Sequence, residues 1–220
     1  MPLGEEGGMK PLVMLGLLAM LAANGADSHP ASLVGDYDGG QMEMAAGLSL
    51  KADGRFDYGL SYGALDEEAH GRWSADDRQV LLTSDPVTPP RFSVTGQQPS
   101  PPRTLRITLA LPGQLNRQYF DAHVRLADGH TLDQQLGMDD TAIPFDPGNP
   151  PVSIVLSLGV FDLASAPYAI DAAKGYQIDF RFDPNDLGKV DFRGAPLRRE
   201  GVDLMFDRYG RTIRFHRVER

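Results

Sequence analysis

One short segment of the sequence could carry a nucleophile. Residues 59–63 read GLSYG, which matches the pattern G-x-S-x-G. In that pattern the serine occupies a sharp turn between a strand and a long helix, and a histidine activates its hydroxyl. Here apolar and polar side chains alternate straight through Ser61, which predicts a strand. We therefore interpret Ser61 as a strand residue near a hairpin end, and a serine hydrolase using Ser61 is the least favoured function.

Two further groups of polar residues could do acid–base or metal chemistry. Residues 66–68 are adjacent acids that we expect in an exposed loop, but acid–base catalysis needs one carboxyl group to be desolvated so that the two pKa values separate. Residues 183–191 (DPNDLGKVD) begin like a calcium loop, yet its fifth and twelfth positions fall on Leu187 and Gly194. No two of the histidines have the i,i+2 or i,i+4 spacing of a metal-binding pair. We expect no catalytic residue, no metal site and no cofactor.

A period of two along the chain predicts the strands that would position these residues. From Met42 to Leu50 the apolar side chains fall on even positions, an Asp-Gly turn follows at 53–54, and the next strand returns through residues 55–62. Similar short runs follow at 69–73, 79–84 and 91–94. Residues 33–96 are therefore expected to form a run of antiparallel strands joined by tight turns.

Aromatic side chains fall on the expected inner face of this first domain. They would either line a pocket for a small apolar ligand or fill a small barrel as its core, and the core is the favoured interpretation. On the other face, Glu68, His70 and Arg72 are expected to be solvated. The candidate ligand-binding residues in the barrel interior are Tyr58, Tyr62, Trp73 and Phe92.

The middle of the chain has a different sequence pattern. Residues 95–103 are polar and proline-rich, which indicates a linker. Longer aliphatic runs follow at 104–111, 120–127, 131–137, 152–161 and 175–183, with shorter pieces at 142–145 and 168–170. About seven strands is the usual number for a small β-sandwich.

The tail, residues 189–220, returns to short strands and tight turns and is rich in arginine. Alternating arginines usually mark a solvated strand face, although they could form a local patch for an anion or a partner. About six strands precede the middle region and about three follow it, and about eight strands close a small barrel. Two arrangements stay open: a barrel of residues 33–96 with 189–220 around an inserted sandwich of residues 103–186, or two consecutive domains, 33–96 and 103–220.

Residues 33–94 resemble small bacterial lipocalin-like domains. The resemblance lies in LVGDYDGG at 33–40, LSLKADGRFDYGLSYG at 48–63 and GRWSADDRQVLLTS at 71–84, and the tail strand pair at 197–218 is of the kind that ends such domains. The middle resembles a transthyretin-like or carboxypeptidase-regulatory-like sandwich only in the spacing of its expected strands along the sequence. The resemblance implies an all-β fold with a small lipocalin-like antiparallel barrel and a β-sandwich, and it implies no defined activity.

The first 25 residues have the order of a secretory signal peptide. A lysine at position 10 precedes an apolar run from Pro11 to Ala23 and then small residues, with Met9 as a possible true start. The run is too short to span a bilayer, which needs roughly 20 residues. We therefore expect a periplasmic or secreted protein with no stable membrane insertion after signal cleavage. An uncleaved short anchor is the alternative.

The net charge and the composition exclude several classes of function. The chain has 220 residues, no cysteine and a formal net charge of −9. Net acidity opposes binding to nucleic acid, and the absence of cysteine excludes disulfides and thiolate chemistry. We expect an exported non-enzymatic binding or interaction protein that takes a small ligand or an envelope protein. A structural envelope module with a filled barrel and no ligand is the alternative.

Overall fold

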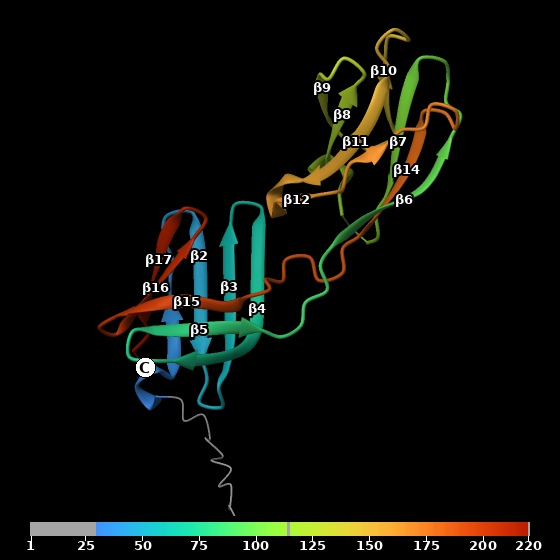
Figure 1. Ribbon diagram of the computed structural model, residues 1–220. Coiled ribbons are helices and arrows are strands. Elements are labelled where there is room, and N and C mark those ends of the chain that lie inside the picture. Colours follow the sequence, from blue (N-terminus) through green and yellow to red (C-terminus); the bar gives the residue numbers. More distant parts are fainter. Residues whose placement is uncertain (1–29, 114, 220) are drawn as a thin grey trace, which may run out of the picture.

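The computed structural model describes residues 30–113 and 115–219, so the expected signal peptide lies outside the described residues. The protein is all-β, with a closed barrel of eight antiparallel strands and two further sheets (Figure 1). This confirms the expected fold class of a barrel plus a sandwich. Figure 1 shows the two parts as separate bodies joined by two segments of chain.

The barrel takes its strands from both ends of the chain, in the order β1-β17-β16-β15-β5-β4-β3-β2. β17 pairs with β1, and β15 pairs with β5. The tail strands therefore close the barrel, and the alternative in which they belong to the sandwich is wrong. The bounds are η1 Ala31–Leu33, β1 Gly35–Asp38, β2 Met44–Leu50, β3 Arg55–Tyr62, β4 Leu65–Ala75, β5 Gln79–Ser84, β15 Arg193–Glu200, β16 Asp203–Arg208 and β17 Arg211–Arg217.

Alternation of side chains along the strands builds the barrel core. In β3, Phe56, Tyr58 and Leu60 point inward and are buried, while Asp57 and Gly59 lie on the outer face. The same period adds apolar side chains from the neighbouring strand β2 and from β16 and β17 on the opposite wall. The result is a continuous hydrophobic core that excludes water from the barrel interior.

The middle of the chain forms a β-sandwich. One sheet has the order β10-β7-β14-β6, and the other has the order β12-β11-β8-β9 with β13 also paired to β11. Apolar side chains from both sheets share one core. The bounds are β6 Arg91–Gln98, β7 Thr104–Ala110, η2 Arg117–Tyr119, β8 Asp121–Leu126, β9 Thr131–Gln135, β10 Thr141–Pro144, β11 Pro151–Leu158, η3 Gly159–Phe161, β12 Leu163–Ala164, β13 Tyr168–Ala169 and β14 Gln177–Asp183.

The strand at 91–98 corrects the expected boundary between the two parts. β6 pairs with β14 in the sandwich and not with any barrel strand. The segment at 95–103, expected to be a linker, is therefore strand up to Gln98. The true connections are residues 85–90 and 184–192. The sequence did not show this boundary, because the pairing partner of β6 lies about eighty to ninety residues further along the chain and leaves no local signal.

The returning connection takes part in the barrel wall. β5 covers only the half of β4 between Gly71 and Ala75. Beside the other half, the Glu68 amide donates to the Gly188 carbonyl at 2.9 Å and the Val190 amide donates to the Glu68 carbonyl at 2.9 Å. Phe192 follows and is buried in the barrel core. The connection that leaves the sandwich thus completes the barrel where β5 has ended.

Gly71 is expected to be essential for the packing of β4 against β5. A Cβ at this position would lie 2.1 Å from the Thr83 carbonyl oxygen and 2.8 Å from the Phe56 ring. Because backbone cannot move aside cheaply, Gly71→Ala should destabilise the barrel by about 2 kcal/mol. The control is Gly59→Ala on the neighbouring strand, where the nearest atom is 4.0 Å away. Chemical denaturation of both variants, followed by tryptophan fluorescence, tests the difference, and equal midpoints would contradict it.

Candidate functional site

The barrel interior, where a ligand was considered, is occupied by aromatic side chains. The Tyr58 ring lies 5.2 Å from Phe192, 6.0 Å from Phe206 and 6.4 Å from Phe215, measured between ring centroids. These rings come from different walls, so their contacts cross the barrel. Trp73 is also buried, and its indole nitrogen donates to the Lys51 carbonyl at 3.0 Å. Tyr58 and Trp73 are core residues that fill the interior.

The other two residues of the expected ligand-binding set lie elsewhere. Tyr62 is at the end of β3 and is 41% exposed. Phe92 belongs to the sandwich, where its ring packs 4.8 Å from Phe182 and 6.0 Å from Phe120. Its assignment to the barrel interior was wrong. Alternating apolar and polar residues are expected of a strand in the barrel and of a strand in the sandwich alike, so the pattern does not show to which of the two the strand belongs. The four residues therefore do not line one pocket.

A charged pair closes one end of the barrel, which we call the mouth. Here β1, β3 and β16 end, and β2, β4 and β17 begin. Glu67 on β4 and Arg208 on β16 both point inward, with side chains only 10% and 21% exposed. The Arg208 guanidinium donates to the Glu67 carboxylate at 2.8 and 3.1 Å, and the Tyr209 hydroxyl also bonds to Glu67. The pair spans the mouth, because β15 and β5 separate the two strands.

Aromatic rings surround this pair. The Arg208 guanidinium carbon lies 5.4 Å from the Phe192 ring and 4.6 Å from the Tyr209 ring. Burial is the largest single influence and would lower the pKa of Arg208, but the hydrogen bonds and charge interaction with Glu67, together with the neighbouring Tyr209 and Tyr58, outweigh it and raise the pKa. Burial, then the contact with Glu67, raises the pKa of Tyr209 to about 12. Arg208 therefore stays charged and Tyr209 stays neutral in the folded protein.

The outer rim of the mouth exposes apolar and aromatic side chains. Met42 is 88% exposed and Tyr209 is 55% exposed. The Arg211 guanidinium carbon lies 5.3 Å from the Tyr62 ring, which forms a second link across the rim. Tyr, Met and Arg are enriched at protein interfaces. The rim, made of Met42, Tyr62, Tyr209 and Arg211, is the candidate contact surface.

Tyr58 beneath the mouth offers a test through alkaline titration. Its hydroxyl is buried and makes no hydrogen bond to another described protein group. Burial raises the pKa of Tyr58, with Arg208 opposing the rise. A tyrosine whose pKa is higher in the folded than in the unfolded protein contributes to folding stability. That contribution is fully present below the pKa of the unfolded state, about 10, and is lost as the pH rises through the pKa of the folded state.

We expect Tyr58→Phe to remove one late-titrating tyrosine and to leave stability at neutral pH unchanged or higher, because an unbonded buried hydroxyl only costs desolvation. Tyrosinate absorbance against pH and denaturant titrations measure both effects. A loss of more than about 1 kcal/mol would show that the hydroxyl is well bonded.

Ser61 has no base beside it. It is exposed on the outer face of β3 and pairs with Ala45 and Asp66 across the strands. His70 lies four residues further along the sheet, where its Nδ1 is 2.7 Å from Asp57. Among residues 30–113 and 115–219 no histidine contacts the Ser61 hydroxyl, so the interpretation as a strand residue agrees with its surroundings.

The other candidate groups are engaged in local contacts. Asp66, Glu67 and Glu68 belong to β4 and not to a loop, so only Glu67 points inward. In the segment 183–191, Asp186 accepts from Lys189 at 2.7 Å and from the Thr88 amide at 2.9 Å, as a turn residue would. In the described part of the chain no group of His, Cys, Asp or Glu side chains is placed to hold a metal ion.

Among the tail arginines that the structure describes, Arg198 and Arg214 alternate with buried neighbours and lie on the outer face of the barrel. Arg214 donates to Asp203 at 2.9 Å, and Arg193 donates to Asp191 at 2.9 Å. These pairings with nearby acids agree with a solvated face. Two arginines lie at inward-facing strand positions: Arg208 points into the mouth, and Arg199 on β15 donates to the Asp76 carbonyl at 2.7 Å.

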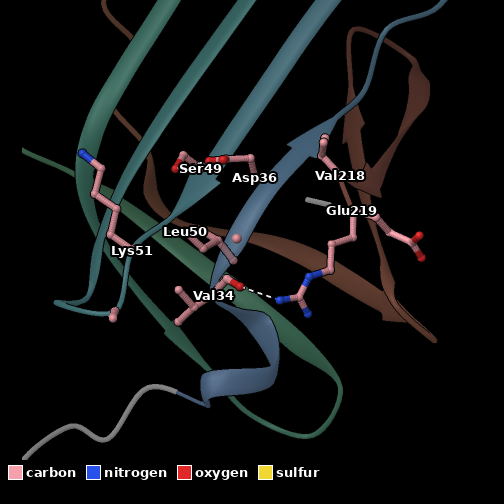
Figure 2. A pocket seen from close by; sticks show the side chains of 10 residues that line it. Val34, Asp36, Ser49, Leu50, Lys51, Val218 and Glu219 are labelled. Atoms are coloured by element: carbon pink, nitrogen blue, oxygen red, sulfur yellow. Dashed lines mark hydrogen bonds between the residues drawn. The ribbon is translucent and has the colours of Figure 1, made fainter.

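A hollow of about 740 Å³ lies at the opposite end of the barrel from the mouth (Figure 2). Figure 2 shows Asp36 and Ser49 side by side, while Lys51 and Glu219 point away from each other at its margins. The Ser49 hydroxyl donates to Asp36 at 2.8 Å, and Arg217 donates to the Val34 carbonyl at 2.6 Å. Because its polar groups already bond to one another, the hollow does not present a set of groups aimed at a ligand.

A serine, a histidine and an aspartate line up on the outer face of the sandwich. His123 Nε2 lies 2.9 Å from Ser157 Oγ, and His123 Nδ1 lies 2.6 Å from Asp133 Oδ1. The three residues come from the adjacent strands β11, β8 and β9. The sequence shows alternation in each strand, but the register that brings these side chains together leaves no signal in it.

No family model, no curated protein and no solved structure matches the chain. None of the helices within residues 30–113 and 115–219 has the length and apolar character required to cross a membrane.

Proposed function

We propose that this protein is exported and works as a binding or interaction protein of the cell envelope, with the barrel mouth as its contact surface. The observation that carries the proposal is the combination of a barrel interior packed with aromatic side chains and a rim that exposes Met42, Tyr62 and Tyr209. A packed interior leaves the outer surface as the place for recognition. The rim has the residue types that dominate binding energy at protein interfaces.

Export is supported by the sequence of residues 9–25, which has the order of a secretory signal. A lipocalin-like character is supported by the strand connections. If the inserted sandwich is set aside, consecutive strands are neighbours all around the barrel, which is the up-and-down arrangement of eight-stranded lipocalin barrels. We infer from this a periplasmic or secreted protein whose barrel has kept the architecture of a ligand carrier with a filled interior.

A photo-crosslinking side chain placed at different ends of the barrel tests the contact surface. We expect Tyr62 replaced by a photoreactive phenylalanine analogue to give a discrete crosslinked product in the producing cell. The matched control is the same replacement at Val202, which is 71% exposed at the turn before β16, on the opposite end. Equal crosslinking at both positions, or none at either, would contradict a contact surface at the mouth.

A further inference from the structure

We propose that Ser157 is an activated nucleophile that accepts an acyl group from short-chain carboxylic esters, with His123 as its base and Asp133 holding the imidazole. This inference lies in the sandwich, so it is independent of the proposed role of the barrel mouth. It goes beyond the proposed function, and it departs from the expectation that the chain has no catalytic residue.

The order of atoms is the one that nucleophilic catalysis by serine requires. Asp133 bonds to Nδ1 of His123, which leaves Nε2 facing the hydroxyl of Ser157. Such a group of three is recognised by geometry and roles, and not by chain order or fold. The strand register places it: His123 lies directly opposite Asp133, and Ser157 is two residues from Val155, the residue opposite His123 on the other side.

The contacts among Ser157, His123 and Asp133 are not needed to give buried polar groups a hydrogen-bond partner or to hold the sheet together. Backbone pairing already joins β8 to β9 and to β11. The side chains of His123 and Asp133 are 39% and 73% exposed, so water could bond to either. A Cβ at Gly159, two residues beyond Ser157, would meet no atom within 4 Å, so the surface just after the end of β11 is open.

The proposed reaction consumes only the ester and water. Ser157 Oγ forms a bond to the acyl carbon while its proton passes to His123 Nε2. The bond from the acyl carbon to the alkoxy oxygen then breaks, and the leaving alcohol takes the proton from Nε2. Water attacks the acyl-serine in the same way, giving the free acid and restoring the hydroxyl.

The position of Ser157 on an open sheet face also determines how fast its reaction with an ester is expected to be. Backbone N–H groups of a central strand lie in the plane of the sheet and bond to its neighbours, so solvent must stabilise the oxyanion. Losing one oxyanion donor costs about 10²–10³ in rate in serine hydrolases. Ser157 is therefore expected to react slowly with esters and to show its activation most clearly with a phosphonylating reagent.

A fluorophosphonate probe on the full-length processed protein tests the inference. Ser157 Oγ forms the bond to phosphorus, fluoride leaves, and the proton passes through His123 to water. Peptide mapping should place the adduct on Ser157. Ser157→Ala should abolish it, and His123→Ala should slow labelling by at least about 10-fold, since a general base contributes about 10²–10⁴. Asp133→Asn should slow labelling less, because Asp133 is largely exposed.

Two matched serines serve as controls. Ser153 lies on the same strand as Ser157, and Ser61 is the serine of the GLSYG segment. Labelling should persist unchanged in Ser153→Ala and in Ser61→Ala, and circular dichroism should show that every variant keeps its fold. The inference would be overturned by an adduct spread equally over exposed serines, by the absence of an adduct on Ser157, or by a His123→Ala variant that labels at the rate of the unaltered protein.

Discussion

Phe192→Ala is expected to destabilise the barrel by about 4 kcal/mol, the cost of removing a large aromatic side chain from a packed core. Phe192 is 5% exposed, and its ring contacts Tyr58 and Phe206 at 5.2 and 5.6 Å between centroids. It sits at the point where the chain returns from the sandwich, so its loss removes contacts between the two ends of the chain. Denaturant unfolding followed by Trp73 fluorescence measures the effect.

The single tryptophan makes this experiment selective for the barrel. Trp73 belongs to the barrel core, and the sandwich core contains no tryptophan among the described residues. Phe192→Leu serves as the conservative control and should cost less, about 1 kcal/mol. If Phe192→Ala left the Trp73 transition where it was, the returning connection would not complete the barrel.

Glu67→Ala is expected to cost about 3 kcal/mol, because it leaves the guanidinium of Arg208 largely buried without its partner. The pair is held by three hydrogen bonds from Arg208 to the Glu67 carboxylate and is covered by Phe192 and Tyr209. The cost comes from the unpaired charge and not from the loss of apolar contacts. Thermal and denaturant unfolding of the single variant at neutral pH measure it.

A double variant separates the charge from the packing. Glu67→Leu combined with Arg208→Met replaces the pair by apolar side chains, and such replacements are often neutral or stabilising. The double variant should recover most of the stability lost in Glu67→Ala. If it were as unstable as the single variant, the cost would lie in the shape of the mouth and not in its charge.

Much of the barrel could be predicted because its signals are local. The alternation expected from Met42 and the Asp-Gly turn at 53–54 lie within one hairpin, and the structure forms that hairpin from Met44 with Gly47 opposite Gly59. Met42 itself precedes β2 and is exposed, so the expected strand was two residues too long at its start. The strand count anticipated that tail strands would be needed for closure. The period of two also placed Tyr58 and Trp73 on inner faces, where the structure has them.

The candidate site was harder to predict because it depends on partners that lie far apart in sequence. The alternation of Ala69, Gly71 and Trp73, continued back two more residues, places Glu67 on the inner face, and this signal was missed when 66–68 was interpreted as a loop. Its partner Arg208 lies at the other end of the chain. Phe92 shows the converse case, in which a correct local alternation could not reveal which sheet the strand joins.

Native mass spectrometry of the protein purified from its own compartment, without refolding, tests the central claim most directly. The claim is that side chains fill the barrel and that recognition takes place on its outer surface. The predicted result is the mass of the processed polypeptide alone, unchanged when the protein is denatured. A larger native mass that falls on denaturation, with loss of a small apolar molecule, would contradict the claim and show that the barrel is a ligand carrier.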